Sequence, residues 1–427
     1  MTSSPDPAAA TSSTNSGPLA GKRVIELGRV LAAPYAGQIL GDLGAEVIKI
    51  ERPGKGDDAR HYAPVYMPAI PGAAGLAGER GDAAHFISVN RNKKSVTLDI
   101  GNPKGQDIVR RLAATADVFV ENYKTGALGR YGLGYDDLKK INPRLVYCSV
   151  TGYGQDGPYA KRAGFDPIFQ AMCGLMGITG VEDGKPGAGP QRAGINIIDI
   201  ITGQNAAMAV VAALYERDLR SGKGQHLDIA LLDSGVAMMS HAAQQYLVSG
   251  VSPKRHLTMG IKTGVSGPLF CADGEVNMNA GRDNYFAAAC GIFGREDLID
   301  DPRFKSQSSR GDYNEYLLQQ FTAAAKNRKA VDVCDELNKA GIPAGVINTM
   351  AQAFADPQSQ HRHLAVPLPH PAKPDLKVIA NPMRFSDSPV SYRMPPPLLG
   401  QHTREVLHEL LGMDDAAIEA LRDEKVI

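Results

Sequence analysis

The chain has 427 residues, enough for two or three domains at roughly 150 residues each. Its 46 basic and 46 acidic side chains cancel, so no excess of positive charge is available to bind nucleic acid or an anionic membrane surface. Apolar residues make up 43% and charged residues 22% of the chain, which is typical of a globular protein rather than a disordered one.

The first segment, residues 1–19, is rich in Ser, Thr, Ala and Pro and has no apolar run of signal-peptide length. We expect it to be a disordered tail. No stretch of about 18 uninterrupted apolar residues follows it, so we expect no membrane span. The five cysteines are odd in number and widely spaced, without a C-x-x-C pair, which favours reduced thiols in the cytoplasm over disulfides or a metal centre.

Strand and helix patterns alternate in the next part of the chain. We expect strands at 23–27, 46–50, 95–99, 118–121 and 145–150. We expect helices between them at 33–43, 104–114 and 135–140. This alternation is typical of βαβ units, and it predicts an α/β fold with an open, doubly wound parallel sheet. We expect residues 20–224 to form this large domain.

A long apolar segment at 202–214 has no polar face, so we expect a helix that is buried on all sides. Beyond it we expect a strand at 226–232, helices at 233–247, 284–293, 313–326 and 330–340, and a hairpin turn at Asp273-Gly274. These elements predict a smaller α/β domain at 225–345. A Pro-rich connection and two closing helices, at 403–411 and 414–422, predict that residues 346–427 return to the large domain.

Several common catalytic motifs are missing. The turn after the first strand, residues 28–34, lacks the G-x-G-x-x-G spacing, which disfavours binding of a nicotinamide dinucleotide. The sequence contains neither G-x-x-x-x-G-K-[ST] nor G-x-S-x-G, which disfavours an ATP-binding loop and a serine hydrolase. His361 and His363 are not part of an H-E-x-x-H pattern, so we expect no catalytic metal.

Two aspartates fall where a carboxylate could have a chemical role. Asp166 precedes Pro167 and has the pattern of a helix N-cap. Asp199 interrupts an apolar run just before the apolar helix, where a charge is costly unless the positive end of that helix holds it. Asp199 is therefore either a cap or a nucleophile, and one carboxylate can have both roles.

Six sequence blocks, taken together and in order, resemble the class III CoA-transferases, the family of formyl-CoA transferase and carnitine CoA-transferase. They are residues 41–57, 90–96, 120–123, 152–154, 194–203 and 395–403. Residues 88–95 and 395–403 look most similar to the succinyl-CoA:glutarate branch of the family. The resemblance implies a Rossmann-like large domain with a smaller inserted domain, and an interlocked homodimer.

The resemblance also implies a covalent mechanism with Asp199 as the nucleophile. The aspartate would attack the donor thioester to give a mixed anhydride, which the released CoA converts into an aspartyl-CoA thioester. A carboxylic acid acceptor would then run the sequence in reverse. Succinyl-CoA is the expected donor and a dicarboxylate the expected acceptor. Coenzyme A takes part as a substrate, and no tightly bound cofactor is expected.

By the same resemblance, the CoA site would involve residues from several loops of the large domain. The matching positions are Val30, Leu31, Ala32, Arg52, Leu98, Asn122, Tyr123, Arg130 and, at the edge of the pocket, Asp166. Arginine is well suited to phosphate groups, which indicates a phosphate-binding role for Arg52 and Arg130.

The sequence departs from some branches of the family. Residues 257–267 lack the run of four glycines found in enzymes for formyl and oxalyl groups, and Leu31 stands where those enzymes have a glutamine. Lys262 or Arg255 could instead pair with a distal substrate carboxylate. The related α-methylacyl-CoA racemases pair the aspartate with a histidine, but Phe165 occupies that position here. A racemase is therefore the second-ranked hypothesis for the function, and a non-catalytic CoA-binding subunit is a further alternative.

Overall fold

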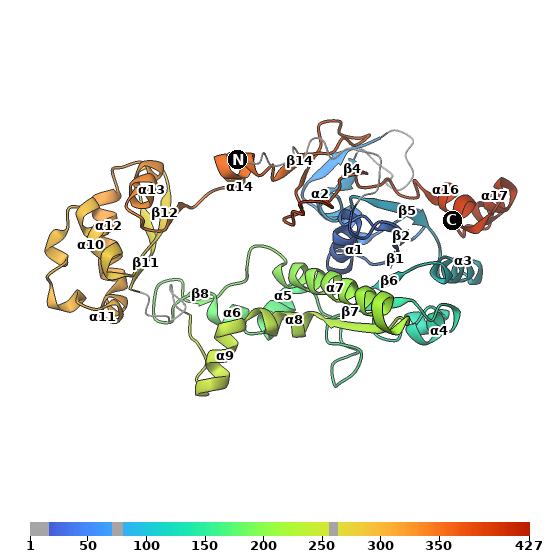
Figure 1. The fold of residues 1–427 in the computed structure, drawn as a ribbon, viewed down its shortest axis with the longest axis horizontal. Coiled ribbons are helices and arrows are strands. Elements are labelled where there is room, and N and C mark those ends of the chain that lie inside the picture. Colours follow the sequence, from blue (N-terminus) through green and yellow to red (C-terminus); the bar gives the residue numbers. More distant parts are fainter. Residues whose placement is uncertain (1–16, 71–79, 256–263) are drawn as a thin grey trace. The chain divides into compact units, whose positions relative to one another are not determined.

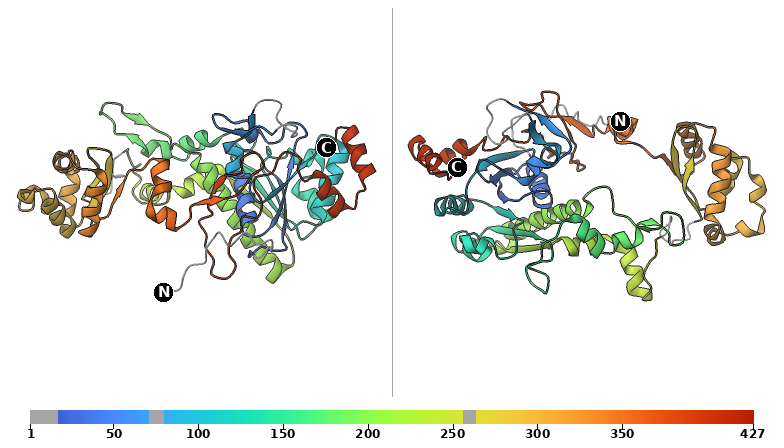
Figure 2. Two further views of the ribbon diagram at one scale, coloured as in Figure 1. Left: turned by 90° about the horizontal axis from the view of Figure 1, so that it is seen from above. Right: turned by 180° about the vertical axis from the view of Figure 1, so that it is seen from behind.

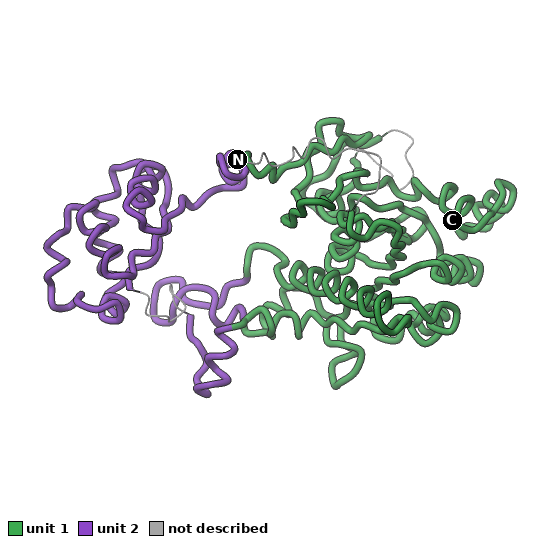
Figure 3. Tube along the Cα trace, viewed as in Figure 1, with its two compact units in different colours: residues 1–174, 193–240, 360–427 green, residues 175–192, 241–359 purple. Residues whose placement is uncertain are grey.

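The computed structural model describes residues 17–70, 80–255 and 264–427. The chain divides into two compact units (Figure 3). The first unit consists of Met1–Gly174, Ala193–Ser240 and Gln360–Ile427. The second consists of Leu175–Arg192 and His241–Ser359. Of the predicted tail, residues 1–16 lie outside the described part of the chain.

A six-stranded parallel sheet forms the centre of the first unit (Figure 1). Its strands, in spatial order, are β10 (His226–Ala230), β7 (Val146–Thr151), β6 (Val118–Glu121), β1 (Arg23–Leu27), β2 (Glu46–Glu51) and β5 (Lys93–Thr97). The α/β parallel-sheet prediction is confirmed. The predicted boundary at 224/225 differs from the structure, because β10 pairs in parallel with β7 and completes the large sheet.

Helices cover both faces of this sheet. On one face lie α1 (Ala32–Asp42) and α7 (Ile197–Glu216), which pack against each other. On the other face lie α3 (Pro103–Ala114), α4 (Tyr135–Ile141), α16 (Thr403–Leu411) and α17 (Asp415–Asp423). The chain's final helix pair lies beside α3 in both views of Figure 2. The last part of the chain thus completes a core that begins with β1.

The alternation of strand side chains explains these two layers. Ile25 and Leu27 belong to the hydrophobic core beneath α3 and α16, whereas Glu26 points toward α1, where Gly37 leaves room for it. Shorter elements complete the unit. They are α2 (Ala84–Ser88), α5 (Asp166–Met172), α8 (Leu231–Met238) and the strand pairs β3 (Tyr66–Pro68) with β4 (Arg80–Ala83) and β14 (Ala365–Pro367) with β15 (Lys377–Ile379).

Helix α7 begins earlier than predicted, and the prediction that it is buried on all sides is wrong. Val210 is fully buried, but Met208, Tyr215 and the following Leu219 are each more than 60% exposed. One face of α7 covers the sheet and α1, and its outer face is also apolar. The segment Ile197–Ser221 is long and apolar enough to cross a membrane, a property that buried core helices share.

The second unit is a smaller α/β assembly with its own hydrophobic core. Its antiparallel sheet has β11 (Val265–Phe270), β12 (Glu275–Ala280) and β13 (Ala344–Val346). The helices α10 (Asp283–Ile292), α11 (Gln307–Asp312), α12 (Asn314–Ala325) and α13 (Ala330–Lys339) surround it. The predicted turn at Asp273-Gly274 is confirmed, because it joins β11 to β12.

The remaining elements lie near the ends of the second unit's segments. They are α6 (Leu175–Ile178), β8 (Gly180–Val181), β9 (Gly189–Pro190), α9 (Ser240–Ser249), α14 (Met350–Ala355) and α15 (Pro357–His361). Arg255, a predicted partner for a substrate carboxylate, pairs instead with Asp183 of the same unit. Lys262, the other predicted partner, lies outside the described residues.

Candidate active site

A cavity of about 280 Å³ lies in the first unit, where β1, β6 and β7 end. The segment after β1 contributes Val30, Leu31 and Ala32 to its wall, and the segment after β6 contributes Asn122 and Tyr123. The first turn of α7 adds Asp199. In open α/β sheets, ligands bind at the carboxyl ends of the strands, so this position favours a substrate site.

Asp199 is the third residue of α7 and the acidic residue of its first turn. Burial, together with the nearby negative charge of Asp166, raises the pKa of Asp199 to about 7. Within the described residues, the Asp199 carboxylate forms no ion pair that would offset this burial. A carboxylate with such a pKa is a stronger base and nucleophile than an ordinary aspartate, yet it still ionises near neutral pH.

Asp166 caps α7 and holds the turn that carries Asp199. The Asp166 side chain is 1% exposed, and its Oδ2 accepts hydrogen bonds from the backbone N–H groups of Ile198 at 2.7 Å and Asp199 at 3.0 Å. Its Oδ1 accepts one from Gln170 at 2.5 Å. The prediction that Asp166 caps its own helix is wrong, because α5 starts at Asp166 and the carboxylate satisfies the free N–H groups of α7 instead.

A close helix contact fixes α7 against the start of α1. Gly203 lies one helical turn after Asp199, and a Cβ atom there would be 2.6 Å from the carbonyl oxygen of Ala32. Because a residue with a Cβ atom could not approach so closely, Gly203 allows the backbones of the two helices to come into direct contact. The nucleophile candidate and the turn at Val30–Ala32 are therefore held by directly packed elements.

Six of the predicted site residues share the cavity: Val30, Leu31, Ala32, Asn122, Tyr123 and Asp199. The Asn122 side chain also joins two cavity loops. Its Oδ1 accepts a hydrogen bond from the Arg29 N–H, and its Nδ2 donates one to the Arg29 carbonyl, both at 2.8 Å. The wall after β1 and the wall after β6 are thus connected.

Four other predicted residues do not line this cavity. Asp166, predicted at the edge of the pocket, accepts the backbone N–H of the lining residue Asp199 but is not itself part of the lining. Arg52 forms an ion pair at 2.5 Å with Asp58, which is itself a lining residue. Leu98 is 1% exposed and belongs to the core on the opposite face of the sheet. Arg130 is exposed at the end of a short helical turn, Leu128–Tyr131. Of these four residues, Arg52 and Asp166 contact lining residues, which are Asp58 and Asp199 respectively.

Three basic residues that the sequence analysis did not single out also line the cavity: Arg29, Lys124 and Arg162. The Arg29 guanidinium lies 4.9 Å from the centre of the Tyr123 ring, and that of Arg162 lies 3.6 Å from the centre of the Tyr159 ring. Arg29 and Lys124 each follow closely after a predicted strand, and that position could have identified them. In the described ranges, no cluster of three or more His, Cys, Asp or Glu side chains could hold a metal ion.

The structure is thus an α/β protein whose pocket is lined by three basic side chains and by the buried carboxylate of Asp199. Comparison with known proteins identifies the family. The model of CoA-transferase family III matches residues 19–403. The chain therefore belongs to CoA-transferase family III, and the predicted resemblance is confirmed.

Individual relatives agree with this assignment. Succinyl-CoA:glutarate CoA-transferase of Mus musculus is 41% identical and aligns with 95% of this chain and 89% of its own length. Succinate–glutarate CoA-transferase of Agrobacterium fabrum is 40% identical, with 94% and 97% of the two chains covered. The crystal structure of a CaiB/BaiF family protein from Brucella suis matches with a TM-score of 0.83 and 40% identity, over 92% of this chain and 100% of that one.

Proposed function

We propose that this enzyme transfers CoA from succinyl-CoA to a dicarboxylic acid such as glutarate, with Asp199 as the covalent nucleophile. The observation that carries the proposal is the buried Asp199 carboxylate, with a pKa of about 7, on the wall of the cavity at the carboxyl ends of the strands. The two glutarate-type relatives support the choice of donor and acceptor.

The reaction needs no cofactor. The Asp199 carboxylate attacks the thioester carbonyl, the C–S bond breaks, and CoA leaves as a thiolate while Asp199 and the succinyl group remain joined as a mixed anhydride. The thiolate then attacks the Asp199 carbonyl carbon, which releases succinate and leaves an aspartyl-CoA thioester. The acceptor carboxylate displaces the thiolate to form a second anhydride. Finally, the thiolate attacks the acceptor's acyl carbon, which gives the new acyl-CoA and regenerates the Asp199 carboxylate.

We assign the phosphate groups of CoA to the basic residues of the cavity wall. Arg29, Lys124 and Arg162 all line the cavity that contains Asp199. Cationic side chains pair strongly with phosphate oxygens, and the Arg guanidinium can form two parallel hydrogen bonds with them. The aliphatic wall of Val30 and Leu31 suits the apolar pantetheine chain that carries the thioester.

A racemase is disfavoured by the identity of another residue on the cavity wall, Phe165. Racemisation at the α-carbon requires a second group that can hold a proton. Phe165 lines the cavity at the position where racemases carry a histidine, and a phenyl ring cannot transfer a proton.

The proposal extends to a homodimer that covers the outer face of α7. Met208, Val211, Tyr215 and Leu219 form an exposed apolar stripe along this helix. Stripes of this kind on a soluble protein mark contact surfaces. In sedimentation velocity at micromolar concentration, we expect a species with the mass of two chains. A single-chain species at all concentrations would contradict the dimer.

The acceptor prediction can be checked with a panel of acids. With succinyl-CoA as donor, we expect glutarate and related dicarboxylates to give higher kcat/KM values than formate, oxalate or monocarboxylates of equal length. An acceptor that lacks the distal carboxylate leaves the enzyme groups that bind this carboxylate unpaired. Its kcat/KM should therefore be about 10- to 100-fold lower. Liquid chromatography of the CoA esters measures each product. Equal rates with monocarboxylates would contradict the dicarboxylate assignment.

A further inference from the structure

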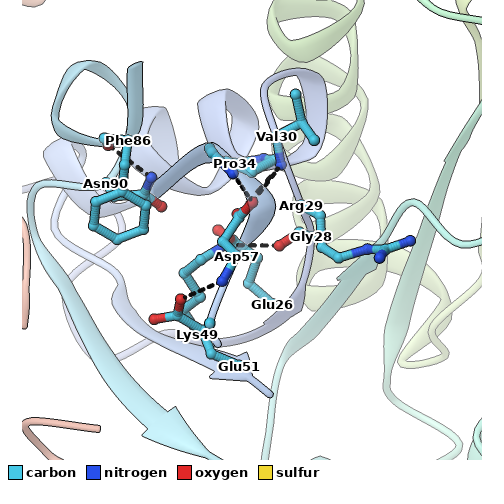
Figure 4. A network of polar contacts seen from close by, with 12 residues as sticks. Glu26, Gly28, Arg29, Val30, Pro34, Lys49, Glu51, Asp57, Phe86 and Asn90 are labelled. Atoms are coloured by element: carbon cyan, nitrogen blue, oxygen red, sulfur yellow. Dashed lines mark hydrogen bonds and ion pairs between the residues drawn. The ribbon is translucent and has the colours of Figure 1, made fainter. Parts of the chain in front are cut away.

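A buried network of charged groups lies directly beneath the turn that forms one wall of the cavity (Figure 4). The turn runs from Gly28 to Leu31 and joins β1 to α1. The network consists of Glu26, Lys49, Asp57 and Lys93, whose side chains are inaccessible to solvent. The mechanism above assigns no role to any of these four residues.

Val30, in the middle of the turn, has an unusual backbone conformation. Its φ is +67°, in the left-handed region that β-branched residues rarely adopt. The Asp57 carboxylate accepts the Val30 N–H with both oxygens, at 2.9 and 3.2 Å. Figure 4 shows the Asp57 side chain directed at this N–H group. Because the conformation is strained, some surrounding contact must hold it, and Asp57 makes that contact.

Lys49 fixes both Asp57 and the beginning of the turn. Its Nζ lies 2.9 Å from the Asp57 carboxylate and 3.0 Å from the Glu26 carboxylate. The same Nζ donates a hydrogen bond of 2.6 Å to the carbonyl of Gly28. Asp57 and Lys49 therefore hold the two backbone groups on either side of Arg29, which lines the cavity.

Lys93 holds the first turn of α1, directly after the Val30 turn, in the same way. Its Nζ donates to the Pro34 carbonyl at 2.7 Å and pairs with Glu26 at 2.8 Å. Helix α1 is shaped to cover this network, because a Cβ atom at Gly37 would lie 1.9 Å from Glu26. Two backbone groups of the Val30 turn and one at the start of α1 are thus bound by three buried charges.

Well-packed apolar residues would often stabilise a fold as well as buried ion pairs do, so this network is better explained by a need for defined geometry. We infer that Asp57 and Lys49 are positioning residues of the transferase, which hold the Val30 turn in the one conformation that places the acyl-CoA thioester against Asp199. This inference rests on the proposed function. Asp57 and Lys49 act through the backbone of the turn and do not touch the substrate.

A double-mutant cycle tests the inference. Asp57→Asn removes the charge and one acceptor oxygen while it keeps the side chain's shape. Val30→Gly supplies a residue that adopts φ +67° without strain. We expect Asp57→Asn to lower kcat/KM about 10- to 100-fold in the parent protein. In the Val30→Gly background we expect the same substitution to cost less than about 3-fold, because the turn no longer needs Asp57.

Asp42→Asn is the matched control. Asp42 is also a buried carboxylate of the first unit, but it pairs with Arg91 at the opposite end of α1. We expect Asp42→Asn to lower the melting temperature and to leave kcat/KM unchanged. The inference would be overturned if Asp57→Asn lowered kcat/KM equally in the parent and in the Val30→Gly background. It would also be overturned if Asp42→Asn lowered kcat/KM by as much as Asp57→Asn does.

Two further measurements separate this inference from the proposed function. Calorimetric titration measures the affinity for CoA of the parent, Asp57→Asn, Val30→Gly and the double variant. Because this measurement needs no turnover, the cycle remains informative if the parent transfers no CoA. Hydrogen exchange of the intact parent protein reports the Val30 N–H directly, even if Asp57→Asn does not fold. We expect this amide to be protected. Exchange at the rate of a free amide would overturn the inference.

Discussion

Replacing Asp199 by asparagine is expected to lower kcat by roughly 10⁴-fold or more, because removal of a covalent nucleophile eliminates the reaction path itself. Asparagine has nearly the same shape, and its amide cannot form the anhydride. Binding of CoA should persist, since the basic residues of the cavity remain in place. The measurement is steady-state transfer from succinyl-CoA together with calorimetric titration of CoA. A residual kcat above about one tenth of the parent's would contradict the nucleophile assignment.

Stability against pH provides the control for this variant. The folded-state pKa of Asp199, about 7, lies above the value of about 4 for an aspartate in an unfolded chain. The parent's stability relative to Asp199→Asn should therefore fall as pH rises from about 4 through 7 and then level off. We expect the variant to melt at a higher temperature than the parent at pH 8, with the difference absent at pH 4. A lower melting temperature at pH 8 would indicate a folding defect.

Replacing Asp166 by asparagine is expected to shift the pH profile of the enzyme. In the parent, kcat/KM should rise with pH through about 7 as Asp199 ionises. The negative charge of Asp166 contributes to that high pKa, so its removal should move the rising limb to lower pH. The asparagine oxygen can still accept the N–H groups of Ile198 and Asp199. The measurement is kcat/KM for succinyl-CoA from about pH 5 to about pH 9, a range that brackets the pKa of Asp199 in the folded protein.

Asp166→Ala distinguishes the electrostatic effect of Asp166 on Asp199 from its role as the cap of α7. Alanine leaves the two N–H groups at the start of α7 without an acceptor, which should lower the free energy of unfolding by about 2 kcal/mol. It should also displace Asp199 and reduce kcat, whereas Asp166→Asn keeps most of the stability. A rising limb at the same pH in the parent and in Asp166→Asn would contradict the electrostatic role of Asp166.

The sequence was sufficient to predict the parallel sheet and to single out Asp199 as the candidate nucleophile, which the structure places on the cavity wall. Short apolar runs such as Arg23–Leu27 and Val118–Glu121 alternate with amphipathic helices, and that local pattern determines strand and helix directly. Asp199 was conspicuous because a carboxylate within an apolar run must have a partner or a function. Both features depend on neighbouring residues in the chain.

The features that were missed depend on contacts between distant segments. The cap that Asp166 supplies to α7 joins residues 32 or more positions apart. The exposed stripe on α7 could not be distinguished from a buried face, because apolar composition is the same in both cases. The charges beneath the Val30 turn lie on β1, β2, β5 and a loop, and only the folded sheet brings them together. Burial and pairing are tertiary properties that a local pattern does not contain.

The most direct test of the central claim is to trap the covalent intermediate on Asp199. The enzyme is incubated with succinyl-CoA and hydroxylamine, which converts an activated aspartyl group into a stable hydroxamate, and the protein is then analysed by mass spectrometry. We predict a modified peptide that contains Asp199 in the parent and no modification in Asp199→Ala. Continued turnover of succinyl-CoA with an unmodified Asp199, or an adduct on a different residue, would contradict covalent catalysis by Asp199.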